Sequence, residues 1–348
     1  MALFGIGRSK RTVGLDIGSG YVKLVAMDHG KGRPRIIKAA ATPLVADAIV
    51  EGEVMDPTLV ASTIRSLFET AGVKERRVVT AVGGRDVIIK RIQMDRMKEA
   101  DAREVIRWEA EQHVPFDMES VELDFQILDP LDEGLQMTVL LVAAKRELVE
   151  NKMALLLDAG LEPEIIDVDA FALHNAFELN YPEAMAGVVG FVNIGHETTN
   201  VNLLEEGVPV LNRDLAFGTR RLRESLQRER GLTAEAAEDV LEGRASDPEL
   251  EDFISQRAEE VALGVERAAA FLQASSTHAG LSRIYVCGGG ARVLRMAEAL
   301  ADRLQVPAEI ANPVQRVDVD PGAFDLISIA DMGPMLVLPV GLALRHAA

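Results

Sequence analysis

The chain has 348 residues, of which 48% are hydrophobic and 26% charged, and its formal net charge at pH 7 is −18. Length and composition predict a globular protein with two lobes. The acidic balance argues against nucleic acid as a partner, because phosphate backbones are bound by clustered Lys and Arg. A single cysteine, Cys287, excludes a disulfide or a thiolate metal site within the chain, so any metal should be an oxygen-ligated ion such as Mg²⁺.

The apolar segments are too short for a membrane span, which needs about 18 residues. The nearest candidate, residues 335–344, contains Pro339. The opening sequence MALFGIGRSKR lacks the apolar core of a secretory signal. We therefore expect a protein of the reducing cytoplasm that does not itself insert into a membrane.

Strands and helices alternate in the predicted first half of the chain. Two strands flank a Gly-Ser-Gly turn, followed by a helix and a strand, at residues 13–17, 21–27, 56–71 and 77–82. A compact β-α-β-β-α unit comes next, at residues 87–93, 98–114, 121–128, 136–143 and 146–159. Its position predicts a small subdomain inserted into the first lobe.

The opening pattern returns in the second half of the chain. A strand at 164–168 and a helix at 170–178 precede a second strand-turn-strand at 188–194 and 200–204. The remaining predicted elements are helices over most of 219–273, a strand at 283–287, a helix at 292–304 and a closing helix at about 333–346. The repeated start indicates a duplicated α/β unit.

The first candidate ligand loop is the turn of the first repeat. Gly18 and Gly20 let successive backbone N–H groups point at one anion, and Ser19 adds a hydroxyl. Lys23 offers a positive charge, and Asp16 could hold Mg²⁺ through water. An ordinary hairpin turn explains the same residues equally well.

Two further loops have similar chemistry. Asn193, Gly195, Thr198 and Thr199 form the turn of the second repeat, where a polar β-turn is the alternative. The run Gly288-Gly289-Gly290, between a strand and the helix expected from Arg292, is typical of an anion or ribose platform at a helix N-terminus. Tight strand–helix packing is the alternative for this loop, and Cys287 before it is expected to be buried.

In this order the loops resemble those of the actin-like ATPase superfamily: two phosphate loops, a connecting helix, an adenosine loop and a closing helix. The corresponding segments are residues 15–23, 190–204, 167–177, 284–297 and 329–345. Within the superfamily the chain is similar to the PilM family of type IV pilus assembly proteins, which is related to the cell-division protein FtsA. The similarity is carried by LFG near the start, GLDIGSGYVKL, VIRWEAEQHVPF, IIDVDAFALHNAF and DLAFGTRRL.

The resemblance implies an α/β, actin-like (RNase H-like) two-lobed ATPase fold with a duplicated core and a small inserted β-α-β-β-α subdomain. The first lobe is expected at residues 11–186, with the insertion at about 85–160. The second lobe is expected at residues 187–332, with a helical subdomain at about 215–282. Residues 333–348 should form a closing helix that returns to the first lobe.

The resemblance also implies ATP and Mg²⁺ as cofactors, with Asp16 facing the metal through water. The residues expected at the nucleotide are Asp16, Gly18, Ser19, Gly20, Lys23, Asn193, Gly195, Thr198, Thr199, Gly218, Glu238, Gly288, Gly289 and Gly290. Asp169, or failing it Asp167, corresponds to the residue that orients the attacking water.

Two departures from the superfamily pattern bear on catalysis. Asn193 stands where an Asp is usual in the second phosphate loop, which weakens the case for Mg²⁺-assisted hydrolysis but not for binding. The helix around Glu238 ends without the expected Lys, so one base or ribose contact is in doubt. We expect weak or absent ATPase activity, with ATP as a structural ligand.

The partner implied by the resemblance is the N-terminal cytoplasmic segment of the inner-membrane protein PilN, bound in a groove beside the inserted subdomain. Other pilus platform and motor components are further expected partners, and the protein would reach the inner membrane through them. On the inserted helix, Ala102, Val105, Ile106 and Ala110 form a stripe expected in the core. Trp108 on its flank is the better candidate for a partner contact, although the sequence favours a core role for it.

Two other functions are compatible with the same fold. An actin-fold kinase of sugars or acids would use Asp167 or Asp169 as its base, but the sequence has no evident sugar-site cluster. An FtsA-like filament protein would carry an amphipathic membrane helix after the closing helix, and the given sequence ends at Ala348 without one.

Overall fold

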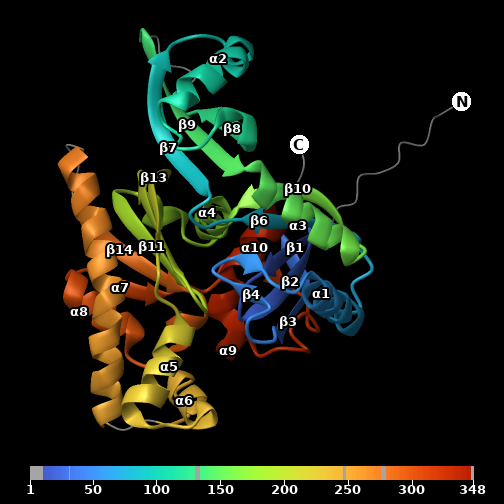
Figure 1. Ribbon diagram of the computed structural model, residues 1–348, viewed down its shortest axis with the longest axis vertical. Helices are drawn as coiled ribbons and strands as arrows, with labels where there is room; N and C mark the ends of the chain where they lie inside the picture. Colours follow the sequence, from blue (N-terminus) through green and yellow to red (C-terminus); the bar gives the residue numbers. More distant parts are fainter. Residues whose placement is uncertain (1–10, 31, 130–133, 246–247, 276–279, 346–348) are drawn as a thin grey trace, which may run out of the picture. The chain divides into compact units, whose positions relative to one another are not determined.

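The computed structural model describes residues 11–30, 32–129, 134–245, 248–275 and 280–345. The residues group into two units, each of which is described by itself (Figure 1). The first unit comprises Met1–Ala81, Leu155–Pro182 and Ala311–Ala348, and the second comprises Val82–Ala154 and Glu183–Ile310. The LFG segment near the start lies outside the described residues, and the domain boundaries given above stay predictions.

A six-stranded sheet forms the centre of the first unit, in the order β10-β6-β1-β2-β3-β16. Its strands are β1 (Arg11–Ile17), β2 (Tyr21–Asp28), β3 (Arg35–Pro43), β6 (Arg77–Val82), β10 (Glu162–Val168) and β16 (Asp318–Val319). β1, β2 and β3 form an antiparallel meander, and β6 runs parallel to β1. Val13 and Leu15 on β1 and Val22 and Leu24 on β2 are buried in one core, as alternation along a strand predicts.

Helices of the first unit pack on both faces of this sheet. α1 (Pro57–Ala71) packs into the core that holds Leu15, and its N-terminus is capped by Asp56, which accepts a hydrogen bond from the Leu59 N–H. On the other face, α10 (Val337–Leu344) lies against β1 and α4 (Asp169–Asn180). A Cβ on Gly14 or Gly341 would overlap Pro339 or Ala172, so these glycines permit the close approach.

The remaining elements of this part of the chain are short or peripheral. They are β4 (Ile49–Val50), β5 (Glu53–Val54), α9 (Ile329–Met332) and α3 (Arg146–Asp158), whose residues divide between the two units. The buried Asn180 fixes the returning segment: its Nδ2 donates to Ala176 O and Pro313 O, and its Oδ1 accepts from Arg316 N.

A five-stranded sheet forms the centre of the second unit, in the order β13-β12-β11-β14-β15. Its strands are β11 (Val188–Ile194), β12 (Thr199–Glu205), β13 (Val208–Leu215), β14 (Leu281–Cys287) and β15 (Ala308–Ile310). Four helices contribute buried residues to the core of this unit: α5 (Thr219–Arg230), α6 (Ala234–Leu241), α7 (Pro248–Ser275) and α8 (Met296–Leu304). Gly264 on α7 lies directly against Leu215 of β13, where a Cβ would overlap the leucine side chain.

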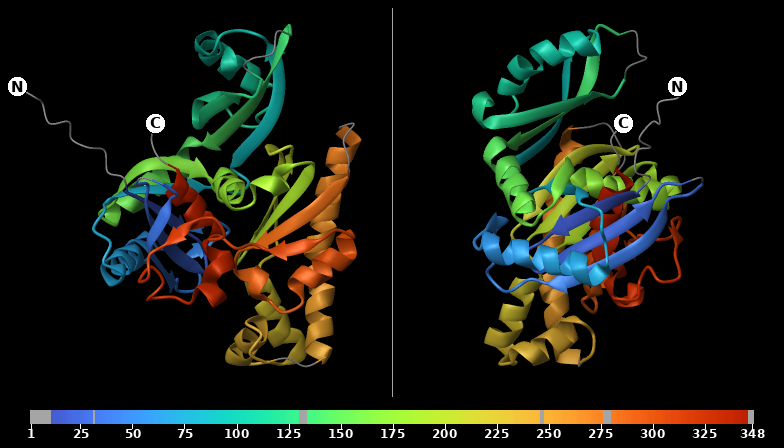
Figure 2. Two further views of the ribbon diagram at one scale, coloured as in Figure 1. Left: turned by 180° about the vertical axis from the view of Figure 1, so that it is seen from behind. Right: turned by 90° about the vertical axis from the view of Figure 1, so that its right-hand side faces the viewer.

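The inserted subdomain belongs to the second unit by its contacts. Its elements are β7 (Val87–Asp95), α2 (Glu99–Glu111), β8 (Val121–Ile127) and β9 (Gln136–Lys145), with the antiparallel strand order β7-β9-β8. Figure 2 shows α2 beside this sheet, and Ile106 of α2 shares a core with Leu141 of β9. Arg91 of β7 forms an ion pair with Glu205 of β12, with 3.5 Å between Nη1 and Oε2.

The two large sheets repeat one topology, which confirms the predicted duplication. β3-β2-β1-β6-β10 in the first unit corresponds to β13-β12-β11-β14-β15 in the second. In both, a strand-turn-strand hairpin starts an antiparallel meander, and a later strand adds in parallel to the first. The third strand of each meander, β3 or β13, is not among the strands predicted from the sequence.

Two helix predictions need correction, one after the glycine run that follows β14 and one at the end of the chain. Residues Gly289–Arg292 form a short 3-10 helix, and α8 begins only at Met296, after Arg295 in a left-handed conformation with φ 66°. The closing segment is broken into α9, a 3-10 helix over Gly333–Leu336 and α10. In the part of the chain that the structure describes, no helix is both long and apolar enough to cross a membrane.

Candidate functional site

The first predicted phosphate loop is a tight hairpin turn in the first unit. Ile17 pairs with Val22, and the turn between them is closed by a 3.0 Å hydrogen bond from Gly18 N to Tyr21 O. Asp16 and Lys23 stand opposite each other and form an ion pair, with 2.7 Å between Oδ2 and Nζ and side chains 15% and 12% exposed. The structure therefore brings together the carboxylate and the cation that the sequence placed at this turn.

The second predicted loop repeats this geometry in the second unit. Gly195 N donates to Thr198 O at 2.9 Å, and a Cβ on Gly195 would lie 2.8 Å from that oxygen. Thr198 is exposed at the turn. Thr199 is buried instead, and its hydroxyl donates to Phe217 O at 2.8 Å, so it supports the turn from within.

The glycine run after β14 packs against the second loop. Gly288 has φ 80°, and a Cβ there would lie 2.5 Å from Asn193 Oδ1. A Cβ on Gly290 would overlap the side chain of Ile194. Loop packing thus explains two of the three glycines, and their approach to a nucleoside stays a prediction. Cys287 before the run is fully buried, as expected, and burial raises the pKa of its thiol.

The start of α5 fixes the second loop from the other side. Thr219 N donates to Gly195 O at 3.0 Å and Arg220 N donates to His196 O at 2.8 Å. Gly218, the cap of α5, lies so close to His196 that a Cβ would overlap its carbonyl. Six predicted positions of the second unit therefore lie in one continuous set of contacts: Asn193, Gly195, Thr198, Thr199, Gly218 and Gly288.

Glu238, which is expected at the nucleotide, lies beside the same helix. Glu238 of α6 is 3.8 Å from Arg223 of α5, measured between Oε2 and Nη1. Burial lowers the pKa of His196, and the Arg223 guanidinium lowers it further, which favours the neutral imidazole at neutral pH. The second loop is thus held without a charge on His196.

The two candidate water-orienting residues belong to the first unit. Asp167, at the end of β10, is buried; its Oδ1 accepts from Val168 N at 2.8 Å, and its Oδ2 lies 3.3 Å from Nε of Arg345. Asp169 is the first residue of α4 and is half-buried. The ion pair to Arg345 gives Asp167 a structural task, which leaves Asp169 as the better candidate.

The acidic side chain beside the first turn bears on whether a nucleotide-bound Mg²⁺ could be held there. Among the residues that the structure describes, no group of three or more His, Cys, Asp or Glu side chains could hold a metal ion. Mg²⁺ commonly keeps several waters and binds through one or two carboxylates and the phosphates of its nucleotide. Asp16, beside the first turn, suits that limited role.

The inserted helix resolves one alternative left open by the sequence. Ala102, Ile106 and Ala110 are buried, so the predicted core stripe is confirmed at these positions. Trp108 is 71% exposed, so a core role for this side chain is wrong. The exposure arises because Trp108 lies on the face of α2 that carries Glu104 and Glu111, both also exposed.

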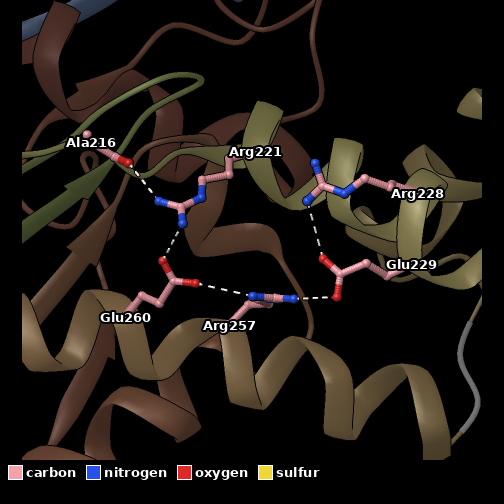
Figure 3. A network of polar contacts seen from close by, with 6 residues as sticks. All are labelled: Ala216, Arg221, Arg228, Glu229, Arg257 and Glu260. Carbon is pink, nitrogen blue, oxygen red and sulfur yellow. Dashed lines mark hydrogen bonds and ion pairs between the residues drawn. The ribbon is translucent and has the colours of Figure 1, made fainter.

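An ion-pair network joins α5 to α7 and was not visible in the sequence. Figure 3 shows Arg221 donating to Ala216 O and pairing with Glu260, which also pairs with Arg257. Arg257 and Arg228 both pair with Glu229. These arginines of α5 therefore connect this helix to α7 while remaining largely exposed to solvent.

A second set that the sequence missed is an amide ladder across β12 and β13. Asn212 donates to Asn202, Asn202 to Asn200, and Asn200 to Asp214, at 2.8, 2.6 and 2.7 Å. Burial raises the pKa of Asp214, and the hydrogen bond from Asn200 partly offsets this. Alternate Asn residues in NVNLL were the available signal, once the paired strand β13 was known.

Comparisons with known proteins agree on one family and one fold. A profile described as type IV pilus assembly protein PilM matches residues 14–347. A solved PilM-PilN type IV pilus biogenesis complex is 32% identical, with 96% of this chain and 98% of that chain covered and a TM-score of 0.84.

More distant solved structures show the fold alone. Ethanolamine utilization protein EutJ from Carboxydothermus hydrogenoformans is 20% identical, covering 96% of this chain and 89% of that chain with a TM-score of 0.57. MreB5 of Spiroplasma citri, solved bound to ADP, is 13% identical, covering 96% and 95% with a TM-score of 0.50. They confirm the predicted actin-like fold. With the family profile spanning nearly the whole sequence, the chain belongs to the PilM family of type IV pilus assembly proteins.

Proposed function

We propose that the chain is an ATP-binding adaptor of a type IV pilus assembly platform and binds the N-terminal cytoplasmic segment of a PilN-type inner-membrane protein. The likeness to the PilM-PilN complex, at 32% identity over 96% of this chain, carries this proposal. The adaptor would reach the inner membrane from the cytoplasm through PilN, and other platform and motor components would contact it there.

ATP binding is supported by the two matching turns and by a relative of the same fold. Each turn is held by a glycine N–H bonded across it, with Ser19 in the first turn and Thr198 in the second as hydroxyl donors. MreB5 was solved with ADP. In the proposed complex, Lys23 faces phosphate oxygens, and Asp16 holds Mg²⁺ through water. The bound Mg²⁺ would neutralise phosphate charge.

Hydrolysis is proposed to be weak or absent. Beside the second turn, Asn193 occupies the position at which a carboxylate would assist the metal. Its side chain is a neutral amide, and its Oδ1 faces Gly288. Asp169 remains the proposed water-orienting residue. Neither the filament alternative nor the kinase alternative has an observation in its favour among the described residues.

Trp108 is the proposed partner contact on the inserted subdomain. A 71% exposed Trp is a large apolar surface, and such side chains are enriched among residues that dominate binding energy. The acidic residues beside it on α2 would attract a basic peptide by charge. A cation of that peptide placed over the indole ring would add a further attraction.

Calorimetric titration of the PilN N-terminal segment into the ATP-saturated full chain tests the adaptor proposal. We expect one-to-one binding at about micromolar affinity, and Trp108→Ala should weaken it at least about fivefold. Phe271→Ala is the matched control, because Phe271 on α7 is also an exposed aromatic, at 64%. No heat at about millimolar peptide would contradict the proposal.

A further inference from the structure

Glu197 is an unexpected side chain in a turn proposed to hold phosphate. It lies in the second turn, between Gly195 and Thr198, and its side chain is only 12% exposed. A carboxylate and a polyphosphate repel each other, and the repulsion grows in a partly desolvated site. Such a residue needs a local partner if the turn is to accept an anion.

Arg220 supplies that partner from the first turn of α5. Its Nη1 lies 3.1 Å from Glu197 Oε1, and its Nε lies 2.9 Å from Glu224 Oε1. Its backbone N–H also donates to His196 O at 2.8 Å. Arg220 is therefore anchored to the second turn by both its main chain and its side chain, and Glu224 fixes the direction of the guanidinium.

We propose that Arg220 is a positioning residue for nucleotide binding: it neutralises Glu197 and holds that carboxylate toward α5, away from the phosphates at the second turn. This rests on the ATP-binding function proposed above. The arrangement also links the turn to α7, because the next residue, Arg221, is paired with Glu260 of that helix (Figure 3).

The inference predicts an effect that depends on ligand charge. If Arg220 is removed, Glu197 loses the positive charge of that guanidinium and its negative charge acts more strongly on the phosphates. The repulsion then scales with the number of phosphate charges, so ATP loses most affinity, ADP less and adenosine almost none. A merely structural defect of the turn would instead weaken all three ligands by similar factors.

The test is equilibrium binding of ATP, ADP and adenosine to the full-length chain and its variants, at fixed ionic strength with Mg²⁺ present. For Arg220→Ala we expect ATP affinity to fall about tenfold, ADP about threefold and adenosine less than about twofold. High salt should shrink the ATP effect. The double variant Glu197→Gln/Arg220→Ala should recover ATP affinity to within about threefold of wild type, since the repelling charge is gone.

Arg221→Ala is the matched control, because Arg221 lies on the same helix as Arg220 but pairs with Glu260 of α7 and not with Glu197 of the turn. It should leave the ratio of ATP to adenosine affinity unchanged. Equal losses of ATP and adenosine in Arg220→Ala, or no rescue by Glu197→Gln, would overturn the inference while leaving ATP binding intact. A wild-type chain that binds neither ATP nor ADP would instead overturn the proposed function, and the inference with it.

Discussion

The hairpin turns of the two duplicated sheets share the same backbone hydrogen bond but carry different side chains at matching positions. In each, a glycine N–H closes the turn onto the carbonyl of its last residue, at 3.0 Å in the first and 2.9 Å in the second. In the same register before the turn, the first hairpin pairs Asp16 with Lys23, and the second pairs Asn193 with Asn200. The position of the ion pair in the first hairpin is thus occupied by two neutral amide side chains in the second.

This difference separates geometry from charge. Glycine and the strand ladder set the turn, so its shape survives the exchange of charged for neutral side chains. In the second unit, Asn200 joins the amide ladder that ends on Asp214 and needs no ionic partner. Under the proposed function, the first hairpin would supply charged groups to metal and phosphate, and the second would supply the same turn shape with Asn193 in place of a carboxylate.

The largest expected effect comes from breaking the ionic pair. Lys23→Met should lower the free energy of unfolding by about 2–3 kcal/mol, because it leaves the largely buried Asp16 unpaired. Asp16→Asn/Lys23→Met should recover most of this loss in urea denaturation. Asn200→Ala, at the matching position, should cost about 1 kcal/mol. Equal losses for Lys23→Met and Asn200→Ala would mean that charge does not distinguish the hairpins.

A smaller effect should separate the two turn glycines. An added Cβ at Gly195 would lie 2.8 Å from Thr198 O, but at Gly18 it would lie 3.3 Å from Tyr21 O. Gly195→Ala should therefore lower stability by about 1–2 kcal/mol and Gly18→Ala by less than about 1 kcal/mol. Thermal unfolding without nucleotide measures both, and the reverse order would contradict the turn geometry.

Restoring a carboxylate to the second hairpin should change turnover. Asn193→Asp should raise Mg²⁺-dependent phosphate release from ATP by about threefold to tenfold, because it adds a group that orders the metal's waters. The double variant Asn193→Asp/Asp169→Asn is the control and should lose the gain. Unchanged release in Asn193→Asp would show that the amide is not what limits hydrolysis.

The smallest expected effect concerns pH. Burial raises the pKa of Asp214 in the folded state, so its contribution to stability is present below the ordinary carboxyl pKa, about 4, and is lost as pH rises through the raised pKa. Asp214→Asn removes this loss. Relative to the variant, the wild type should lose stability over that window and stay level above it. A difference that is constant with pH, measured by denaturation, would contradict the assignment.

Local signals made the hairpins predictable from sequence. Val188–Ile194 is apolar and bounded by glycines, and its predicted limits match β11. The strands β3 and β13 were not predicted because their strand conformation depends on packing and pairing with the neighbouring strands β2 and β12, which local sequence patterns do not indicate. The predicted start of a helix at Arg292 is wrong, because Arg295 has a left-handed backbone conformation and α8 begins after it, at Met296.

At the candidate site, side-chain pairs between residues far apart in the chain could not be predicted from the sequence. Asp16 and Lys23 were placed together because a tight turn makes them neighbours. The pairing of Glu197 with Arg220 joins residues 23 apart, and nothing in their spacing indicates it. The pairing of Asp167 with Arg345 depends on where α10 packs, and this shifts the proposed water-orienting role to Asp169.

The most direct measurement is the identity of the nucleotide released when the purified full-length protein is denatured. The ionic Asp16–Lys23 position of the first hairpin and the neutral Asn193 of the second predict ATP, bound and not turned over, with Asn193→Asp shifting the released nucleotide toward ADP. Release of ADP from the wild type would contradict weak hydrolysis. Failure to bind ATP even when it is supplied at about millimolar concentration would contradict nucleotide binding itself.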